Sequence, residues 1–136
     1  MTTPAPTSEA ANPARKQYRV LYADDMQQLR ELIGIVLSRD GHTVESAADG
    51  RLGLEKIATN PNAFDVVITD HHMPNCNGLQ LVEGIRALPV PYQGKIIVFS
   101  SELSESVDLA YRRLKVDHIL PKPIFPAQLR QLFAKL

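Results

Sequence analysis

The segment FDVVITD, from Phe64 to Asp70, restricts the possible folds of this chain more than any other segment. Its centre, Val66 to Ile68, holds three consecutive β-branched residues and lacks the polar–apolar alternation of a strand with one face in water. A short run that is apolar at each position is typical of a strand covered on both faces, as in parallel sheets. The segment KIIVFS, from Lys95 to Ser100, has the same character. The sequence therefore predicts a parallel sheet with helices on both faces.

Strand-like and helix-like segments alternate along the rest of the chain. The other predicted strands run from Tyr18 to Ala23, from His42 to Ser46 and from His118 to Leu120. Apolar residues at helical spacing predict helices at about Leu29 to Leu37, Arg51 to Thr59, Leu79 to Leu88, Leu103 to Leu114 and Leu129 to Leu136. Five such units with right-handed connections favour a flavodoxin-like α/β fold: a doubly wound five-stranded parallel sheet, order 2-1-3-4-5, with five helices.

The chain has 136 residues, which is enough for one domain with its own core and too few for two full-size domains. Residues 1–16, MTTPAPTSEAANPARK, contain three prolines and almost no large apolar side chain. Such a segment buries too little surface to offset the entropy of ordering it, so we predict a disordered tail there. The predicted domain covers residues 17–136.

Charge and composition exclude several classes of protein. Lys plus Arg number 15 and Asp plus Glu number 15, and this zero net charge argues against a dedicated DNA-binding domain. The single cysteine, Cys76, excludes an intramolecular disulfide and suits a reducing compartment. No apolar run reaches the ~18–20 residues of a membrane-spanning helix, and the N-terminus lacks the apolar core of a signal peptide. We therefore expect a cytoplasmic protein without membrane insertion.

Polar residues stand where the predicted strands end. Asp24 and Asp25 follow the first strand, Asp70 ends the third, Ser100 ends the fourth and Lys122 follows the fifth. The carboxyl ends of parallel strands meet at one edge of the sheet, so we expect these side chains to lie together. Three adjacent carboxylates repel one another, and a divalent cation bound by oxygen ligands, typically Mg²⁺, relieves that repulsion. With a lysine and a hydroxyl beside it, the set is typical of phosphoryl transfer to a carboxylate.

From about Tyr18 to Leu136 the chain resembles the receiver domain of two-component response regulators. The residues that carry the resemblance are Asp24-Asp25, Asp49-Gly50, Ile68-Thr69-Asp70, Met73-Pro74, Gly78, Ser100 and Lys122-Pro123. The resemblance implies that a phosphohistidine on a sensor histidine kinase or a histidine phosphotransfer protein gives its phosphoryl group to Asp70. It also implies a switch that is read by a downstream protein target. The given sequence ends with the last predicted helix, so we expect either a stand-alone receiver or a piece of a larger regulator.

The resemblance also implies a role for each residue at the site. Asp25 and Asp70 are expected to ligate Mg²⁺ directly and His72 through its backbone carbonyl, while Asp24 acts nearby through a water molecule. The same comparison gives Lys122 the role of pairing with the phosphoryl group, and Lys122-Pro123 resembles a family position where the peptide bond is often cis.

Ser100 takes the place of the switch hydroxyl in this resemblance, but the chain departs from the family pattern close to it. Many receivers have Tyr or Phe three residues before the lysine, and this chain has Ile119. The pair Lys115-Val116 replaces a common Gly-Ala pair, and Pro121 is unusual directly before the lysine. These departures indicate an altered signalling surface around the fourth helix, the fifth strand and the fifth helix, where the target is expected to bind.

Two adjacent histidines, His71 and His72, follow Asp70. The triplet DHH also occurs in a phosphoesterase family, but that family needs further metal-binding motifs and a longer chain. Neighbouring histidines on a loop point apart and lack other ligands, which argues against zinc. Both are expected to be exposed loop side chains. A sharper hypothesis places His72 and Glu102 beside the path of the water that hydrolyses the aspartyl phosphate.

Two other functions remain open from the sequence. A pseudo-receiver would have this fold and bind a partner without phosphorylation, and Ile119 keeps that alternative open. A phosphorelay shuttle would pass the phosphoryl group from Asp70 to another histidine. We expect Mg²⁺ as the cofactor, no direct contact with nucleic acid, and a monomer or weak dimer.

Overall fold

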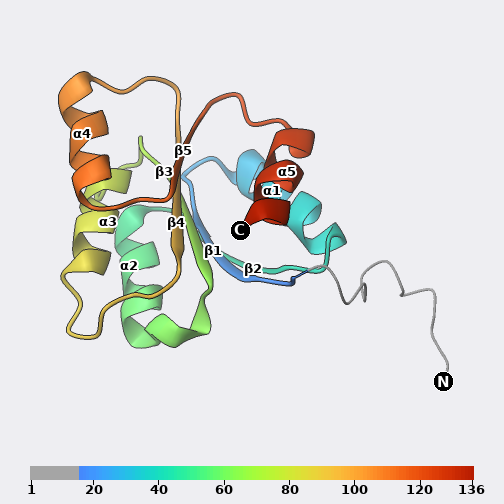
Figure 1. Ribbon diagram of the computed structural model, residues 1–136, viewed down its shortest axis with the longest axis horizontal. Coiled ribbons are helices and arrows are strands. Elements are labelled where there is room, and N and C mark those ends of the chain that lie inside the picture. Colours follow the sequence, from blue (N-terminus) through green and yellow to red (C-terminus); the bar gives the residue numbers. More distant parts are fainter. Residues whose placement is uncertain (1–15) are drawn as a thin grey trace, which may run out of the picture.

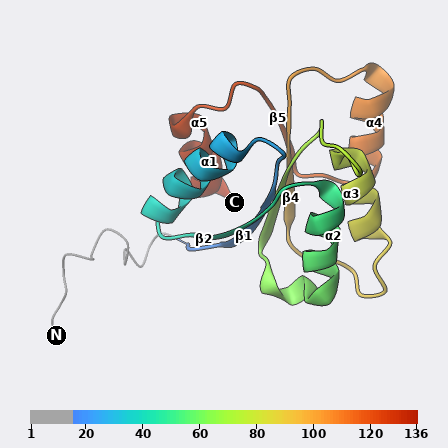
Figure 2. The ribbon, with the colours of Figure 1, turned by 180° about the vertical axis from the view of Figure 1, so that it is seen from behind.

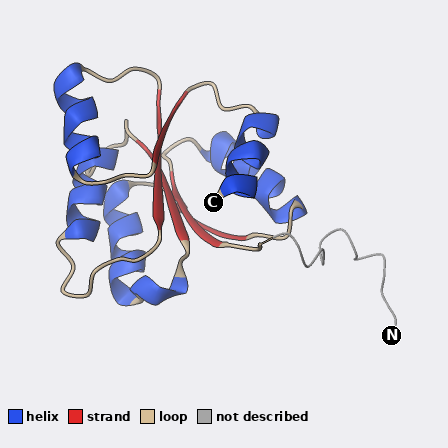
Figure 3. Ribbon diagram, in the orientation of Figure 1, coloured by secondary structure: helices blue, strands red, loops and turns tan. Residues whose placement is uncertain are grey.

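The computed structural model describes residues 16–136 of the chain. Its strands are β1 (Arg19–Ala23), β2 (Thr43–Ala47), β3 (Val66–Asp70), β4 (Lys95–Ser100) and β5 (His118–Pro121). Its α-helices are α1 (Gln27–Arg39), α2 (Gly50–Thr59), α3 (Gly78–Arg86), α4 (Glu105–Arg113) and α5 (Pro126–Lys135), and a 3-10 helix, η2 (Pro61–Ala63), precedes β3. Figure 3 shows strands and helices alternating along the chain, as the sequence predicts. The predicted tail, residues 1–16, lies outside the described residues except for Lys16.

The five strands form one parallel sheet of order β2-β1-β3-β4-β5, which confirms the predicted topology. Helices α1 and α5 cover one face, and α2, α3 and α4 cover the other (Figure 1). The view from behind shows the same two layers (Figure 2). None of the helices within residues 16–136 is both long enough and apolar enough to cross a membrane.

The central strand β3 is buried at all of its positions, because its side chains enter two separate cores in turn. Val66 and Ile68 pack with residues of α1 and α5, such as Ile33. Val67, between them, packs with residues of α2, α3 and α4, such as Leu81. Burial on both faces explains why this segment lacks alternation in its sequence. It also explains why the strand and its terminal aspartate hold a fixed place in the domain.

Three loops at the carboxyl edge of the sheet end in side chains that cap the next helix. Asp49 caps α2, Asn77 caps α3 in a reciprocal pair with its third helical residue, and Ser104 caps α4. Each side-chain oxygen accepts a hydrogen bond from a backbone N–H that the helix leaves unpaired, which contributes about 0.5–2 kcal/mol. The cap at Ser104 also explains why α4 begins two residues after Leu103, where apolar spacing alone predicts its start.

Helix α4 ends in a residue with left-handed backbone geometry. Lys115 has φ 61°, and its N–H donates to the carbonyl of Arg112 at 3.0 Å. The next N–H, that of Val116, donates to the carbonyl of Tyr111 at 3.3 Å. This pair of hydrogen bonds defines a Schellman ending, a motif in which the left-handed residue is usually glycine. The lysine therefore occupies a position where its Cβ is unfavourable.

We predict that Lys115→Gly stabilises the domain. Glycine adopts the left-handed conformation without strain, and after the greater flexibility of the unfolded chain is deducted, about 0.5–1 kcal/mol remains. Urea denaturation measures the change in the free energy of unfolding. The matched control is Arg113→Gly, which removes an exposed cation from the same helix end but lies in helical geometry, and it is expected to destabilise by about 1 kcal/mol. Equal effects of the two variants would contradict the prediction.

Candidate functional site

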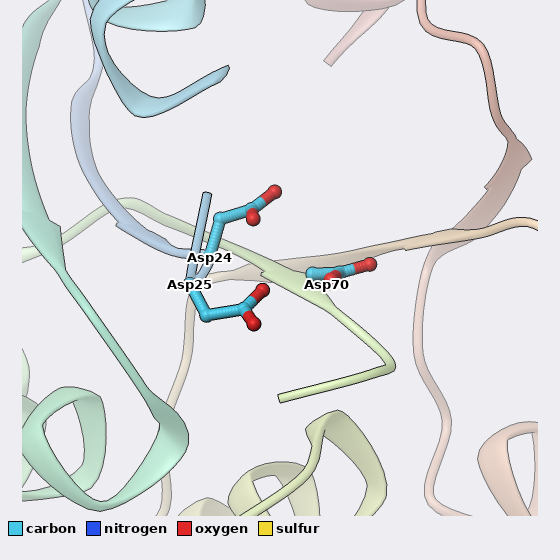
Figure 4. Close-up of side chains that lie close together, drawn as sticks. All are labelled: Asp24, Asp25 and Asp70. Atoms are coloured by element: carbon cyan, nitrogen blue, oxygen red, sulfur yellow. The ribbon is translucent and has the colours of Figure 1, made fainter. Parts of the chain in front are cut away.

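Three aspartates gather at the carboxyl edge of the sheet (Figure 4). Asp24 and Asp25 follow β1, and Asp70 ends β3, the neighbouring strand. The register pairs Ala23 with Thr69, and this places the next residues, Asp24 and Asp70, side by side. One carboxylate oxygen of each aspartate lies within 4.8 Å of the other two. The strand order thus brings together side chains that lie far apart in the sequence.

The carboxylate of Asp24 is fully buried and bonded on both oxygens. The Tyr22 hydroxyl donates to Oδ2 at 2.7 Å, and the backbone N–H of Met26 donates to Oδ1 at 2.9 Å. Asp25, by contrast, is exposed at the rim, while Asp70 is 2% exposed. The cluster therefore has two buried carboxylates in fixed positions and one that faces solvent.

Lys122 brings positive charge to this cluster from the loop after β5. Its Nζ lies 2.9 Å from Oδ1 of Asp70 and 3.9 Å from Oδ2 of Asp24. Its backbone N–H donates to the carbonyl of Ser100 at 2.9 Å, and the bond to Pro123 is cis. Lys122 thus connects the ends of β3, β4 and β5 at one point.

The charges of the site are unbalanced when only protein groups are counted. Burial raises the pKa of Asp70 above its ordinary value; the hydrogen bond from Lys122 lowers it in part, and the charges of Asp24 and Asp25 raise it again. One lysine facing three carboxylates leaves net negative charge. The oxygen-only ligands, with one aspartate at the solvent boundary, fit a hard cation such as Mg²⁺ that keeps part of its water shell.

Ser100 lies at the end of β4 beside this cluster, as predicted. Its side chain is 4% exposed, and its Oγ has no hydrogen-bond partner among the described residues. A buried hydroxyl without a partner is costly and calls for an explanation. Next to it, a groove of about 410 Å³ runs between α4 and β5, lined in part by Glu102, Ile119 and Pro121. Ser100 itself is among the residues that line this groove.

The two histidines after Asp70 lie in different environments. His72 is exposed, as expected, but the prediction of an exposed side chain is wrong for His71, which is 9% exposed. Nδ1 of His71 lies 2.6 Å from the hydroxyl of Tyr111, and which atom donates depends on the imidazole tautomer. Burial, with the charge of His72 as a smaller contribution, lowers the pKa of His71 and so favours its neutral form. Sequence reasoning missed this pair because its members are 40 residues apart.

The rest of the β3–α3 loop is anchored to the start of α2. The side chain of Asn75, which has φ 66°, donates to Oδ2 of Asp49 at 3.1 Å. The N–H of Gly50 donates to the carbonyl of Cys76 at 3.1 Å. Burial, reinforced by the charge of Asp49, raises the pKa of the Cys76 thiol, which does not favour a reactive thiolate. Cys76 is thus part of the loop packing.

Residues 20–134 match the response regulator receiver domain family, so the chain belongs to that family. The response regulator MprA of Mycolicibacterium vanbaalenii is 34% identical over 122 residues, a match that covers 87% of this chain and 48% of that protein. This chain spans less than half the length of several curated relatives, MprA among them. The acidic triad is suited to Mg²⁺-dependent phosphorylation of an aspartate.

Solved structures agree with this assignment. The chemotaxis protein CheY4 of Vibrio cholerae superposes with a TM-score of 0.79 at 28% identity, covering 88% of this chain and 98% of that one. CheY in the CheX-CheY-BeF3-Mg complex of Borrelia burgdorferi superposes with a TM-score of 0.76, covering 84% of each chain. At 21% identity, the second likeness shows the fold alone.

We predict that Asp70→Asn stabilises the domain when no divalent cation is added. The raised pKa means that the native state binds the Asp70 proton more tightly than the unfolded state does. This group therefore lowers stability as the pH rises from its unfolded pKa through its raised native pKa, so its cost is larger at neutral than at acid pH. The neutral amide removes that cost, about 1 kcal/mol or more for a like-charge contact. Thermal unfolding at neutral pH in EDTA measures the effect.

Addition of Mg²⁺ is the internal control for this prediction. Ligand binding to the native state raises the melting temperature of the wild type. The variant is expected to gain much less, because it lacks one ligand. A variant that is less stable than the wild type in EDTA, or that gains equally from Mg²⁺, would contradict the prediction.

Proposed function

We propose that this protein is a phosphorylation switch that takes a phosphoryl group onto Asp70 and thereby changes its binding to a partner protein. The observation that carries the proposal is the contact of 2.9 Å between Lys122 and Asp70 inside the cluster of three aspartates. A buried carboxylate at that place, raised in pKa and paired with one lysine, has no evident structural task.

The proposed reaction is a displacement at phosphorus. A carboxylate oxygen of Asp70 attacks the phosphorus of a phosphohistidine, forming a P–O bond. The P–N bond breaks, and its electron pair stays on the imidazole nitrogen of the donor. Asp25, Asp70 and the backbone carbonyl of His72 would hold Mg²⁺, with Asp24 acting through a water molecule. The bound ion supplies positive charge that offsets the charge of the phosphoryl oxygens.

Lys122 and Ser100 are the proposed binding groups for the transferred phosphoryl group. The Nζ of Lys122 is within hydrogen-bond distance of Asp70 and pairs with a phosphoryl oxygen once the aspartate is modified. The buried Oγ of Ser100, which has no partner among residues 16–136, gains one by turning toward that oxygen. This movement links the chemistry to the β4–α4 loop, and it biases an equilibrium between two arrangements of that loop.

The proposed partners are a donor with a phosphohistidine and a target that binds the α4-β5-α5 surface. The donor is a sensor histidine kinase or a histidine phosphotransfer protein. For the target, the groove of about 410 Å³ between α4 and β5 supports a surface that changes when Ser100 moves, since Ser100 lines it. The CheY protein of Borrelia burgdorferi, whose complex with CheX contains BeF3 and Mg, lends support by analogy of fold.

We predict that acetyl phosphate and Mg²⁺ add one phosphoryl group, about 80 Da, to the intact protein. Asp70→Asn and the wild type in EDTA are expected to keep the unmodified mass, because one lacks the nucleophile and the other the ion. Asp65→Asn is the matched control: Asp65 directly precedes β3, at the end opposite Asp70, and pairs with Arg19. This variant is expected to gain the phosphoryl group.

The outcomes of this experiment separate the alternatives. If neither acetyl phosphate nor a phosphohistidine donor modifies the protein and beryllofluoride does not bind, the proposal is wrong and the pseudo-receiver stands. Modification followed by rapid return of the phosphoryl group to a phosphotransfer protein favours the relay shuttle. Stable modification that changes partner binding favours the switch.

We predict that His72→Ala shortens the lifetime of the phosphorylated protein. The exposed imidazole two residues after Asp70 and the exposed Glu102 flank the proposed approach of the attacking water. A smaller side chain opens that approach, and we expect hydrolysis to become about threefold faster or more. The decay of the phosphorylated mass gives the rate. The control is His118→Ala, which replaces an exposed histidine at the start of β5. If the phosphoryl group is lost equally fast in both variants, the proposed role of His72 is wrong.

A further inference from the structure

Helix α4 is attached to the domain through few buried groups. Of its 9 residues only Tyr111 is buried, and that side chain is 0% exposed. Just beyond the helix, Arg86 of α3 donates hydrogen bonds to the carbonyls of Leu114 and Lys115, at 2.8 and 3.0 Å. The helix is thus held by Arg86 at its C-terminal end, by the buried Tyr111, and by the partly buried Val107 and Leu114, which pack against the same core. Tyr111 is the one side chain among these that is both fully buried and hydrogen-bonded to another element.

Tyr111 contacts the residue that follows the candidate phosphorylation site. Its hydroxyl lies 2.6 Å from Nδ1 of His71, and the two rings meet edge to face with centroids 5.5 Å apart. Both side chains are buried, so water competes little for this hydrogen bond. Among residues 16–136 no other hydrogen bond joins a side chain of α4 to the segment that carries Asp70.

The backbone of His71 is fixed on both sides, which makes its side chain a stiff connection. Its N–H donates to the carbonyl of Phe99 at 3.0 Å, and its carbonyl accepts from the N–H of Gly78 at 2.9 Å. Packing is close here, since a Cβ on Gly78 would lie 2.8 Å from the Tyr111 hydroxyl. Phe99 precedes Ser100, so a movement at the end of β4 reaches His71 through one hydrogen bond.

We propose that the hydrogen bond between His71 and Tyr111 couples the occupancy of Asp70 to the position of α4. The proposal rests on the proposed phosphorylation of Asp70 and adds the route by which that event reaches the surface. Ser100 turns toward the phosphoryl group, the Phe99 carbonyl moves with it, and His71 carries the shift to Tyr111. Because coupling is reciprocal, a partner that binds α4 also changes the affinity of the Asp70 site by the same factor.

Tyr92 provides a matched control for a purely structural role of Tyr111. It is also buried, and its hydroxyl donates to the carbonyl of Phe64 at 3.1 Å, near the end of β3 opposite Asp70. Tyr92→Phe and Tyr111→Phe each remove one buried hydroxyl and keep the ring. Both variants lose similar stability, while only Tyr111→Phe cuts the connection between Asp70 and α4.

The test measures hydrogen exchange of the α4 amides, residues 105–113, with and without beryllofluoride and Mg²⁺. We expect adduct formation to change these exchange rates roughly tenfold in the wild type and in Tyr92→Phe. In Tyr111→Phe the adduct still forms, but the change in α4 falls below about twofold. His71→Leu removes the other partner, and combining it with Tyr111→Phe produces no further loss, because both substitutions break the same bond.

Three results overturn the coupling while the phosphorylation proposal stands, and the third concerns the Tyr92 control. The first is a full α4 response in Tyr111→Phe, and the second is a wild type that forms the adduct without any α4 response. Adduct formation is read separately, from the fluorine signal of bound beryllofluoride. Its absence in the wild type overturns the phosphorylation proposal and the coupling together. An equal loss of response in Tyr92→Phe would also overturn the coupling, because it would show an effect of stability alone.

Discussion

The electrostatic balance between Lys122 and the three aspartates is the interaction on which the rest of this structure depends. Two of the carboxylates are buried, and a single ammonium group lies 2.9 Å from one and 3.9 Å from the other. Such an arrangement is tolerated because Asp24 has donors on both oxygens and because Asp25 remains in solvent. The arrangement leaves net negative charge at the site. A bound cation, or a charged group that binds together with a cation, changes that charge strongly. The site is therefore poised to respond to what binds it.

The loops around this site differ in how firmly they are held. The β3–α3 loop is tied to α2 through Asn75 and Cys76 and to α4 through His71. The loop between β4 and α4 is mostly exposed, and its first neighbour, Ser100, holds a hydroxyl with no partner among residues 16–136. Asp70 thus lies between a loop with several anchoring hydrogen bonds and a loop that is largely exposed. Under the proposed coupling, a shift in the second loop reaches α4 through the contact of His71 with Tyr111, the one buried side chain of that helix.

The sequence predicts what local patterns encode and misses what distant contacts decide. The apolar run before Asp70 predicts a doubly covered strand, and the strand order then places Asp25 and Lys122 beside it, as the structure confirms. The burial of His71 was not predictable in this way. A histidine on a loop is usually solvated, and the hydroxyl of Tyr111 on α4, far away in the sequence, offsets the cost of burying this one. The contact that Tyr111 makes with His71 was not predictable either, because an aromatic residue at helical spacing indicates only a core position.

The absence of an aromatic side chain at Ile119 and the buried position of Tyr111 are best considered together. An aliphatic side chain on β5 has no polar atom, so it cannot exchange a hydrogen bond at the site for one at the surface. The Tyr111 hydroxyl has that capacity, and it lies on α4, bonded to the residue after Asp70. Tyr111 packs in the core beneath α4, whereas Ile119 lies on the edge strand β5 and lines the same groove as Ser100. With an aliphatic residue at that place on β5, the polar contact between the site and this surface is the one that Tyr111 makes, and this agrees with the proposed coupling through α4.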